Sequence, residues 1–331
     1  IGTLSVFATT SAAFGPTIRG LLIQFGGWPI IFYVNLPVLA IGLILTILYI
    51  PRDEKSSKKT YKWDGIGILL FSGFVTCWMI FLLALEEQFQ WGTLIIAILL
   101  TFLFCLYEMR IEEPFINVNF FRKNMNISLI YVQYILSTVI FFAILLSIPT
   151  FLQSVLQASS QAAGMTMLSL SVFAMIFTPI ATRWMERAGF RMPLFISAII
   201  GLAGILLLFT VEEHSLLLWV GIVLAVTGIS NGIQNIGLQN LLYSFISVSE
   251  SGINSGLLMT SRFIGNILAS SIYGVVFASG MNSANLDKMS VVLLAVAIVL
   301  IPGMVSKAQR RKVRQLVRNF RQYRQAFLPY T

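Results

Sequence analysis

Charged residues are scarce in this sequence. Asp, Glu, Lys and Arg make up 11% of the 331 residues, while hydrophobic residues make up 57%; a soluble domain carries about 25% charged residues. One histidine and two cysteines, both cysteines inside apolar runs, exclude a disulfide framework and give no basis for a metal ion or cofactor. The 13 acidic residues all lie in connections or near the ends of apolar runs. An enzyme, which needs a convergent catalytic set, is therefore not expected.

Long apolar runs fill the space between the charged residues. A helix needs about 20 apolar residues to cross roughly 30 Å of hydrocarbon. Ten such runs cover residues 2–25, 29–50, 65–85, 92–108, 127–152, 164–184, 193–211, 216–241, 253–280 and 288–306. Hydrocarbon offers no partner to an unpaired backbone amide, and the runs do not alternate as barrel strands do. The sequence predicts an all-α fold, a polytopic transmembrane helix bundle with ten spans.

The basic residues predict which side of the membrane is cytoplasmic. All of the 22 except Arg19, Arg262 and Lys288 lie after the second, fourth, sixth and eighth runs or in the C-terminal tail. By the positive-inside rule this side is cytoplasmic. The tail, residues 307–331, spaces apolar side chains helically among basic ones. We expect it to lie along the anionic inner leaflet and to bind no nucleic acid.

A pattern of small residues and proline occurs in the first run. It consists of Ser11, Gly15, Pro16 and Gly20, followed by GGW at 26–28 and FYVNLP at 32–37. Small residues four apart let helix backbones approach closely, and proline permits a bend. The pattern resembles the antiporter motif of the drug:proton antiporters of the major facilitator superfamily, and the trailing segment resembles their fourteen-helix branch. Arg19 stands where that family usually has glycine; it either faces a cavity or snorkels outward.

Three later segments carry the same resemblance. WDGIG at 63–67 resembles the start of the family's seventh helix, TRWMERAGFR at 182–191 its cytoplasmic loop, and residues 250–266 its thirteenth helix. The resemblance covers residues 1 to about 306 and implies that four further helices precede the ten spans. It divides the chain into residues 1–50 (last two helices of the N-terminal bundle), 51–63 (cytoplasmic loop), 64–110 (two extra helices), 111–126 (cytoplasmic loop), 127–306 (C-terminal six-helix bundle) and 307–331 (tail).

Polar and aromatic residues within the apolar runs are the candidates for a substrate cavity. Three amides of the eighth run, Asn231, Asn235 and Gln239, are four apart and share one stripe of the helix. Aromatic rings of the fifth run could stack on a flat apolar ligand or a cation. For each amide, a hydrogen bond between helices is the alternative explanation. The predicted cavity residues are Tyr131, Gln133, Tyr134, Phe141, Phe142, Asn231, Gln234, Asn235, Gln239 and Asn266.

A second group of residues predicts a cytoplasmic gate. It contains Arg183, Glu186, Arg187, Gly189 and Arg191 of the 182–191 loop, together with Arg262. Glu186 is close enough in sequence to pair with Arg187 or Arg191, and a pair formed in one conformation only can bias an equilibrium. The hypothesis is that this loop latches an outward-facing state. Arginines that only set the topology are the alternative.

The resemblance implies a proton-coupled antiporter that exports amphipathic or cationic drugs by alternating access. The expected partners are a small-molecule substrate, protons and the lipid bilayer, and a monomer in the bacterial cell membrane, with its C-terminus cytoplasmic, is expected. The alternative is an exporter of one metabolite such as an amino acid, a peptide or a siderophore; a membrane receptor or enzyme is a remote one. The resemblance places the proton-carrying carboxylate on preceding helices. Asp64 is the best-placed carboxylate present, although it can also serve as a partner of a helix N-terminus.

Overall fold

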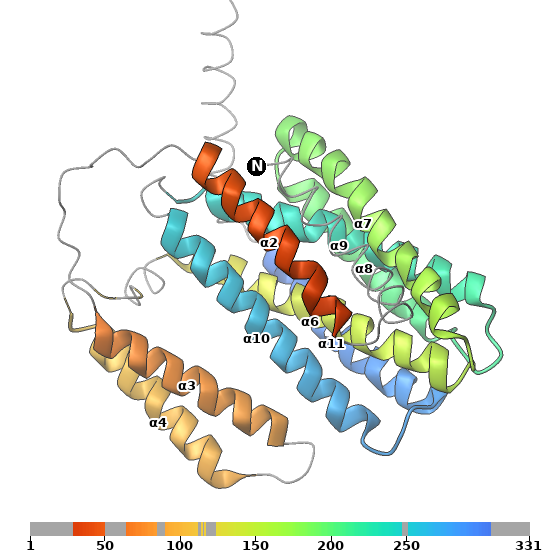
Figure 1. Ribbon diagram of the computed structural model, residues 1–331, viewed down its shortest axis with the longest axis horizontal. Coiled ribbons are helices and arrows are strands. Elements are labelled where there is room, and N and C mark those ends of the chain that lie inside the picture. The colour runs from red at the N-terminus through yellow and green to blue at the C-terminus, as the bar shows by residue number, and fades with distance from the viewer. Residues whose placement is uncertain are drawn as a thin grey trace, which may run out of the picture.

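The computed structural model of the protein is helical throughout the part it describes, which is residues 29–49, 64–84, 90–111, 114, 116, 124–246 and 251–305. Nine helices and no strand occur in these ranges (Figure 1). They are α2 (Ile30–Tyr49), α3 (Gly65–Ala84), α4 (Trp91–Glu108), α6 (Met125–Ser154), α7 (Ser160–Ala188), α8 (Arg191–Leu208), α9 (Leu217–Tyr243), α10 (Ser251–Phe277) and α11 (Ser283–Val305). The all-helical fold predicted from the apolar runs is confirmed.

The predicted count of ten spans is not matched. Eight described helices are long and apolar enough to cross a membrane, and the run at 2–25 lies outside the described residues. The described helix that is not apolar enough to count as a membrane span is α10, which was predicted as the span 253–280. It meets the length requirement, but Arg262, Asn266 and several serines lower its hydropathy. In a membrane bundle such a helix is stable where its polar face contacts other helices or water instead of lipid.

Helices α6 to α11 form one bundle. Helix α9 packs against α7, α8 and α6, while α6 also packs against α10 and α11, and α11 against α8 (Figure 1). Two apolar clusters occupy the two ends of this bundle. The first includes Ile148, Phe151, Leu208, Val220 and Met289; the second includes Ile130, Met185, Leu194, Leu241 and Leu300. Between the two clusters, near the midpoints of the helices, lies a layer of small and polar residues.

Glycines bring α9 into backbone contact with α7. A Cβ atom added to Gly228 would collide with the carbonyl oxygen of Leu170, and one added to Gly232 with the carbonyl oxygen of Ala174. The hydroxyl of Thr178 adds a hydrogen bond of 3.4 Å to the Gly232 carbonyl oxygen. Small residues four apart are a common means of close helix packing in membranes. Gly228 and Gly232 thus let the backbones of α7 and α9 approach each other closely.

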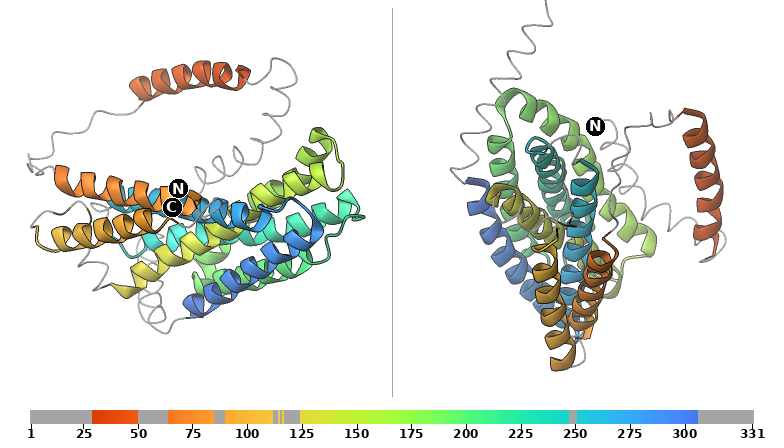
Figure 2. Two further views of the ribbon diagram at one scale, coloured as in Figure 1. Left: turned by 90° about the horizontal axis from the view of Figure 1, so that it is seen from below. Right: turned by 90° about the vertical axis from the view of Figure 1, so that its left-hand side faces the viewer.

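Helices α3 and α4 form a hairpin that lies beside α10 (Figure 1). The rings of Phe71, Phe74 and Phe104 pack together between the two helices, with centroids 5.1–5.8 Å apart. The indole of Trp78 donates a hydrogen bond of 3.0 Å to Thr101. Helix α2, by contrast, lies apart from the other described helices (Figure 2), and none of its apolar span is buried within the chain.

Candidate functional site

A chain of hydrogen bonds crosses the middle layer of the α6–α11 bundle. The hydroxyl of Ser137 on α6 donates to the side-chain oxygen of Gln234 on α9, at 2.7 Å. The Gln234 amide donates to the hydroxyl of Ser230 at 3.1 Å, and Ser230 donates to the carbonyl oxygen of Ser197 on α8 at 2.7 Å. All four residues are buried. These hydrogen bonds, called the relay below, pair buried polar groups of α6, α8 and α9. Apolar packing of the three helices would not require polar residues at these positions.

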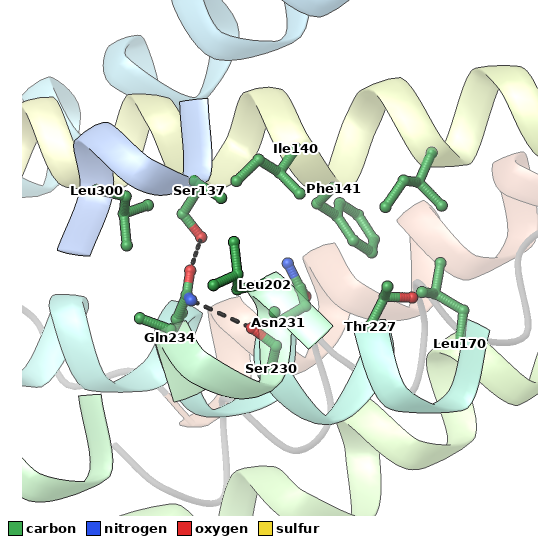
Figure 3. A pocket seen from close by; sticks show the side chains of 14 residues that line it. Ser137, Ile140, Phe141, Leu170, Leu202, Thr227, Ser230, Asn231, Gln234 and Leu300 are labelled. Atoms are coloured by element: carbon green, nitrogen blue, oxygen red, sulfur yellow. Dashed lines mark hydrogen bonds between the residues drawn. The ribbon is translucent and has the colours of Figure 1, made fainter. Parts of the chain in front are cut away.

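The relay borders a small cavity of about 30 Å³ (Figure 3). Phe141, Asn231 and Gln234, three of the predicted substrate-cavity residues, line it together with Ser137 and Thr227. A buried water needs about 10–15 Å³ of such volume, whereas ligand pockets are ten times larger or more. The cavity therefore has room for one or two waters and is too small for a drug-sized molecule.

A second polar cluster joins α10 to α6 and α9. The guanidinium of Arg262 on α10 donates a hydrogen bond of 2.8 Å to the hydroxyl of Tyr134 and a longer one of 3.5 Å to the side-chain oxygen of Asn235. Its charge also lies 5.9 Å from the centre of the Tyr134 ring, within the range of a cation–π contact. Tyr134 and Asn235, predicted for the substrate cavity, thus lie together with Arg262, predicted for the gate.

Two further contacts bind the beginning of α10 to its neighbours. The hydroxyl of Tyr131 on α6 donates to the side-chain oxygen of Asn254 at 2.7 Å. The hydroxyls of Tyr243 on α9 and Ser255 lie 2.8 Å apart in a hydrogen bond. Together with Arg262, these contacts form a polar seam along the first half of α10. We refer to Tyr131, Tyr134, Asn235, Tyr243 and their α10 partners as the α10 seam.

The remaining predicted cavity residues are not drawn into one site. Phe142 packs at the edge of the first apolar cluster. Gln239 and Asn266 are half-buried. Gln133 is 2% exposed, and neither polar atom of its amide has a hydrogen-bond partner among the described residues. The sequence could not separate Gln133 from Gln234, because both are amides within similar apolar runs.

The segment 182–191, predicted as a cytoplasmic loop, is mostly helical: residues 182–188 form the end of α7, and Arg191 begins α8. Helix α7 ends at Ala188, and Gly189 follows with a φ of 80° while its N–H bonds to the Met185 carbonyl oxygen at 2.8 Å. A glycine in a positive-φ conformation is a common helix stop. The charged side chains of the loop, which are Arg183, Glu186, Arg187 and Arg191, are all exposed. No ion pair joins Glu186 to these arginines in the described part of the chain.

Asp64 and Glu108 lie together at one end of the α3–α4 hairpin. Asp64 accepts a hydrogen bond of 2.8 Å from the N–H of Gly67, so it serves as the predicted partner of a helix N-terminus. Glu108 is 1% exposed and is the buried one among the described carboxylates. Its burial was not predicted. The sequence feature that could have indicated burial is that Glu108 is the last residue of the run 92–108 and the one charged residue in it.

Several predictions concern segments outside the described residues. These are the antiporter-motif residues Ser11, Gly15, Pro16 and Gly20, the loop 51–63, most of the loop 111–126, and the basic tail 307–331.

Apolar helices with a polar layer at their midpoints define a multi-pass α-helical membrane protein. The family model described as Major Facilitator Superfamily matches residues 1–270 and 130–327. The chain belongs to this superfamily of transporters. The extent of the match agrees with the resemblance noted over residues 1 to about 306.

Several bacterial transport and drug-resistance proteins are similar to the chain over most of its length. The chain is 33% identical over 298 residues to the uncharacterized MFS-type transporter YwoD of Bacillus subtilis, covering 89% of the chain and 66% of that protein. It is 27% identical over 297 residues to the multidrug resistance protein Stp of Mycobacterium tuberculosis, covering 86% and 53%. It is 26% identical over 294 residues to the tetracenomycin C resistance and export protein of Streptomyces glaucescens, covering 87% and 54%. The chain spans between about half and two thirds of the length of these relatives.

Proposed function

We propose that the complete protein is a proton-coupled antiporter that exports amphipathic or cationic compounds across the bacterial cell membrane. The observation that carries this proposal is the α10 seam beside the amides of α9. Asn231, Asn235 and Gln239 recur every fourth residue, and all three are half-buried. An amide stripe left partly open in a membrane bundle is suited to line a wet cleft.

The cleft would form between two bundles. Residues 127–306 supply the C-terminal six-helix bundle in this account, and the N-terminal bundle includes residues 1–50. The small cavity beside the relay lies inside one bundle, so it is distinct from that cleft. Substrate sites of such transporters lie near the bilayer midplane, between the repeats. The midplane position of the polar layer, between two apolar clusters, fits this arrangement.

Alternating access requires contacts that exist in one conformation and break in another. The bond between Arg262 and Tyr134 joins α10 to α6 at the end of the bundle that the charge asymmetry assigns to the cytoplasm. In this account the α10 seam closes or opens the cytoplasmic half of the cleft. The exposed 182–191 loop could form its own contacts in the opposite conformation, since Glu186 is unpaired with its arginines here.

The substrate class follows from the aromatic side chains beside the amides. Phe142 on α6 is half-buried, and in this account its ring face stacks on a flat apolar ligand or a cation. Stp carries a multidrug resistance name, which supports a broad range of compounds. The tetracenomycin C protein is named for a single compound, and this supports the second candidate, an exporter of one metabolite.

The test is the accumulation of a fluorescent cation in cells that express the complete gene product. We expect less dye in these cells than in cells with an empty vector, and a protonophore should abolish the difference. Arg262→Gln should raise accumulation towards the empty-vector level, whereas Arg110→Gln, at an exposed position, should not. Unchanged accumulation across a panel of structurally different dyes would contradict broad export and favour the single-metabolite candidate.

A further inference from the structure

One carboxylate oxygen of Glu108 has no hydrogen-bond donor among the described residues. The residue ends α4 and is 1% exposed. Its Oε2 accepts a hydrogen bond of 3.2 Å from the N–H of Ile116. Its Oε1 is buried and has no hydrogen-bond partner among the described residues. An ionised carboxylate in such a position loses its hydration without full compensation, which disfavours the ionised form.

Asp64 faces this oxygen from the start of α3. The carboxyl groups of Asp64 and Glu108 are within hydrogen-bonding reach of each other. They flank the same point above Gly67, where an added Cβ atom would collide with Oδ2 of Asp64 and come within 2.5 Å of Oε1 of Glu108. The other oxygen of Asp64 accepts from the Gly67 N–H at 2.8 Å and from the Tyr107 hydroxyl at 3.2 Å. Glycine at position 67 leaves the space that brings the two carboxyl groups together.

Two adjacent carboxyl groups of this kind do not both ionise, because like charges in a buried site repel. A single proton removes the repulsion and supplies the donor that Oε1 of Glu108 lacks. We propose that Asp64 and Glu108 bind one proton between them, as a proton-binding site at the end of the α3–α4 hairpin. Glu108 carries the proton, since it is the more buried of the two, and its hydroxyl then donates to the Asp64 carboxylate.

The groups around the site agree with a proton as the ligand. Tyr107 donates to Asp64, and Cys105 lies three residues before Glu108 on α4. Arg110 lies two residues after the end of α4, and its side chain is exposed. Helix α10, which packs against α3, carries one charged residue, Arg262, and this side chain is bonded to Tyr134 and Asn235. The described part of the chain has no group of three metal-ligating side chains.

This inference goes beyond the proposed export function and does not depend on it, since the hairpin can hold a proton whether or not the protein moves a drug. Infrared spectroscopy of the purified complete protein in lipid nanodiscs tests it directly. At neutral pH we expect a C=O stretching band of a protonated carboxyl group. That band should be lost in Glu108→Gln and kept in the control Glu186→Gln, which alters an exposed carboxylate.

A second variant distinguishes a shared proton from a lone buried acid. In Asp64→Asn the repelling charge is removed and an amide donor faces Glu108, so ionised Glu108 becomes easier to form. The band should then disappear at a lower pH than in the unmodified protein. The proposal is overturned if the unmodified protein shows no such band at neutral pH, if the band survives in Glu108→Gln, or if Asp64→Asn leaves its titration unchanged. Glutamine at 108 can itself donate to Asp64, so this variant is expected to fold.

Discussion

Arg262 on α10 and Tyr134 on α6 lie 128 positions apart in the sequence and are joined by a hydrogen bond of 2.8 Å. The guanidinium also faces the ring of the same tyrosine, at 5.9 Å from its centre. Tyr134 is 2% exposed. A charge inside a membrane bundle is costly unless it is paired or wet. This contact therefore pairs the charge of Arg262 and joins α10 to α6 within the α10 seam.

Removing the Tyr134 hydroxyl should weaken the seam while the ring remains in place. In Tyr134→Phe, Arg262 keeps the ring contact and the longer bond to Asn235. We expect a loss of about 0.6 to 1.7 kcal/mol in the free energy of unfolding, the range found for hydrogen bonds between membrane helices. Thermal unfolding in detergent micelles measures it. Tyr273→Phe is the control, because its hydroxyl makes an exposed bond of 3.4 Å; an equal loss in both variants would contradict the role of Tyr134.

The contact between α7 and α9 should tolerate no side chain at Gly228. An alanine there would push its methyl group into the backbone of Leu170. Since backbone cannot move aside as a side chain can, we expect a destabilisation of about 1–3 kcal/mol, typical of overpacking. Gly221→Ala in the same helix meets only the Ser169 hydroxyl, at 3.8 Å, and should be close to neutral. If the two variants unfold at the same temperature, the close packing described here is wrong.

The relay should depend on Ser137 as its first donor. In Ser137→Ala the buried side-chain oxygen of Gln234 loses its 2.7 Å partner, while the cavity beside it gains room for another water. We expect a loss of about 0.6 kcal/mol or somewhat more, seen as a lower unfolding temperature. Ser147→Ala is a matched control on the same helix, because Ser147 is also buried but bonds only to the Ala143 carbonyl oxygen within its own helix turn. A larger effect of the control would argue against the relay.

Gly67 should be required where Gly65 is not. An added methyl group at 67 would strike Asp64 and approach Glu108, whereas at 65 it would meet nothing within 4 Å. Gly67→Ala should therefore separate the two carboxyl groups and lower the unfolding temperature of the complete protein. Gly65→Ala should leave it the same or raise it slightly, as alanine is the better helix former. Equal behaviour of the two variants would show that the carboxyl groups do not meet at this point.

The helices could be predicted from the sequence because hydrocarbon forces each long apolar run to form one. The end points of α9 and α10 differ from the predicted runs by a few residues. The number of membrane-spanning helices was less predictable. Arg262 and the other polar residues of α10 contact neighbouring helices, and the same residues lower the hydropathy of α10. The local polarity of a sequence cannot distinguish a polar helix face that contacts other helices from one that contacts water.

The sequence could not predict which of the candidate site residues lie together. Asn235, Tyr134 and Arg262 were predicted individually, yet the cavity and the gate were treated as separate groups, and the structure brings these three together. Gln234 has partners and Gln133 has none among the described residues, although both are amides in apolar runs. Glu108 is buried because residue 116 returns to contact it. Such differences depend on tertiary contacts between distant segments.

The central claim is that the complete protein exchanges protons for an amphipathic cation. Its most direct test is a transport assay with liposomes that contain the purified protein in their membrane. A fluorescent cation is added to the buffer outside the liposomes. With an acidic interior imposed, we expect the dye to accumulate inside, at a rate that falls at least several-fold in Arg262→Gln and to zero when a protonophore collapses the gradient. Dye uptake that is the same with and without the pH gradient, or the same in liposomes lacking the protein, would contradict the account.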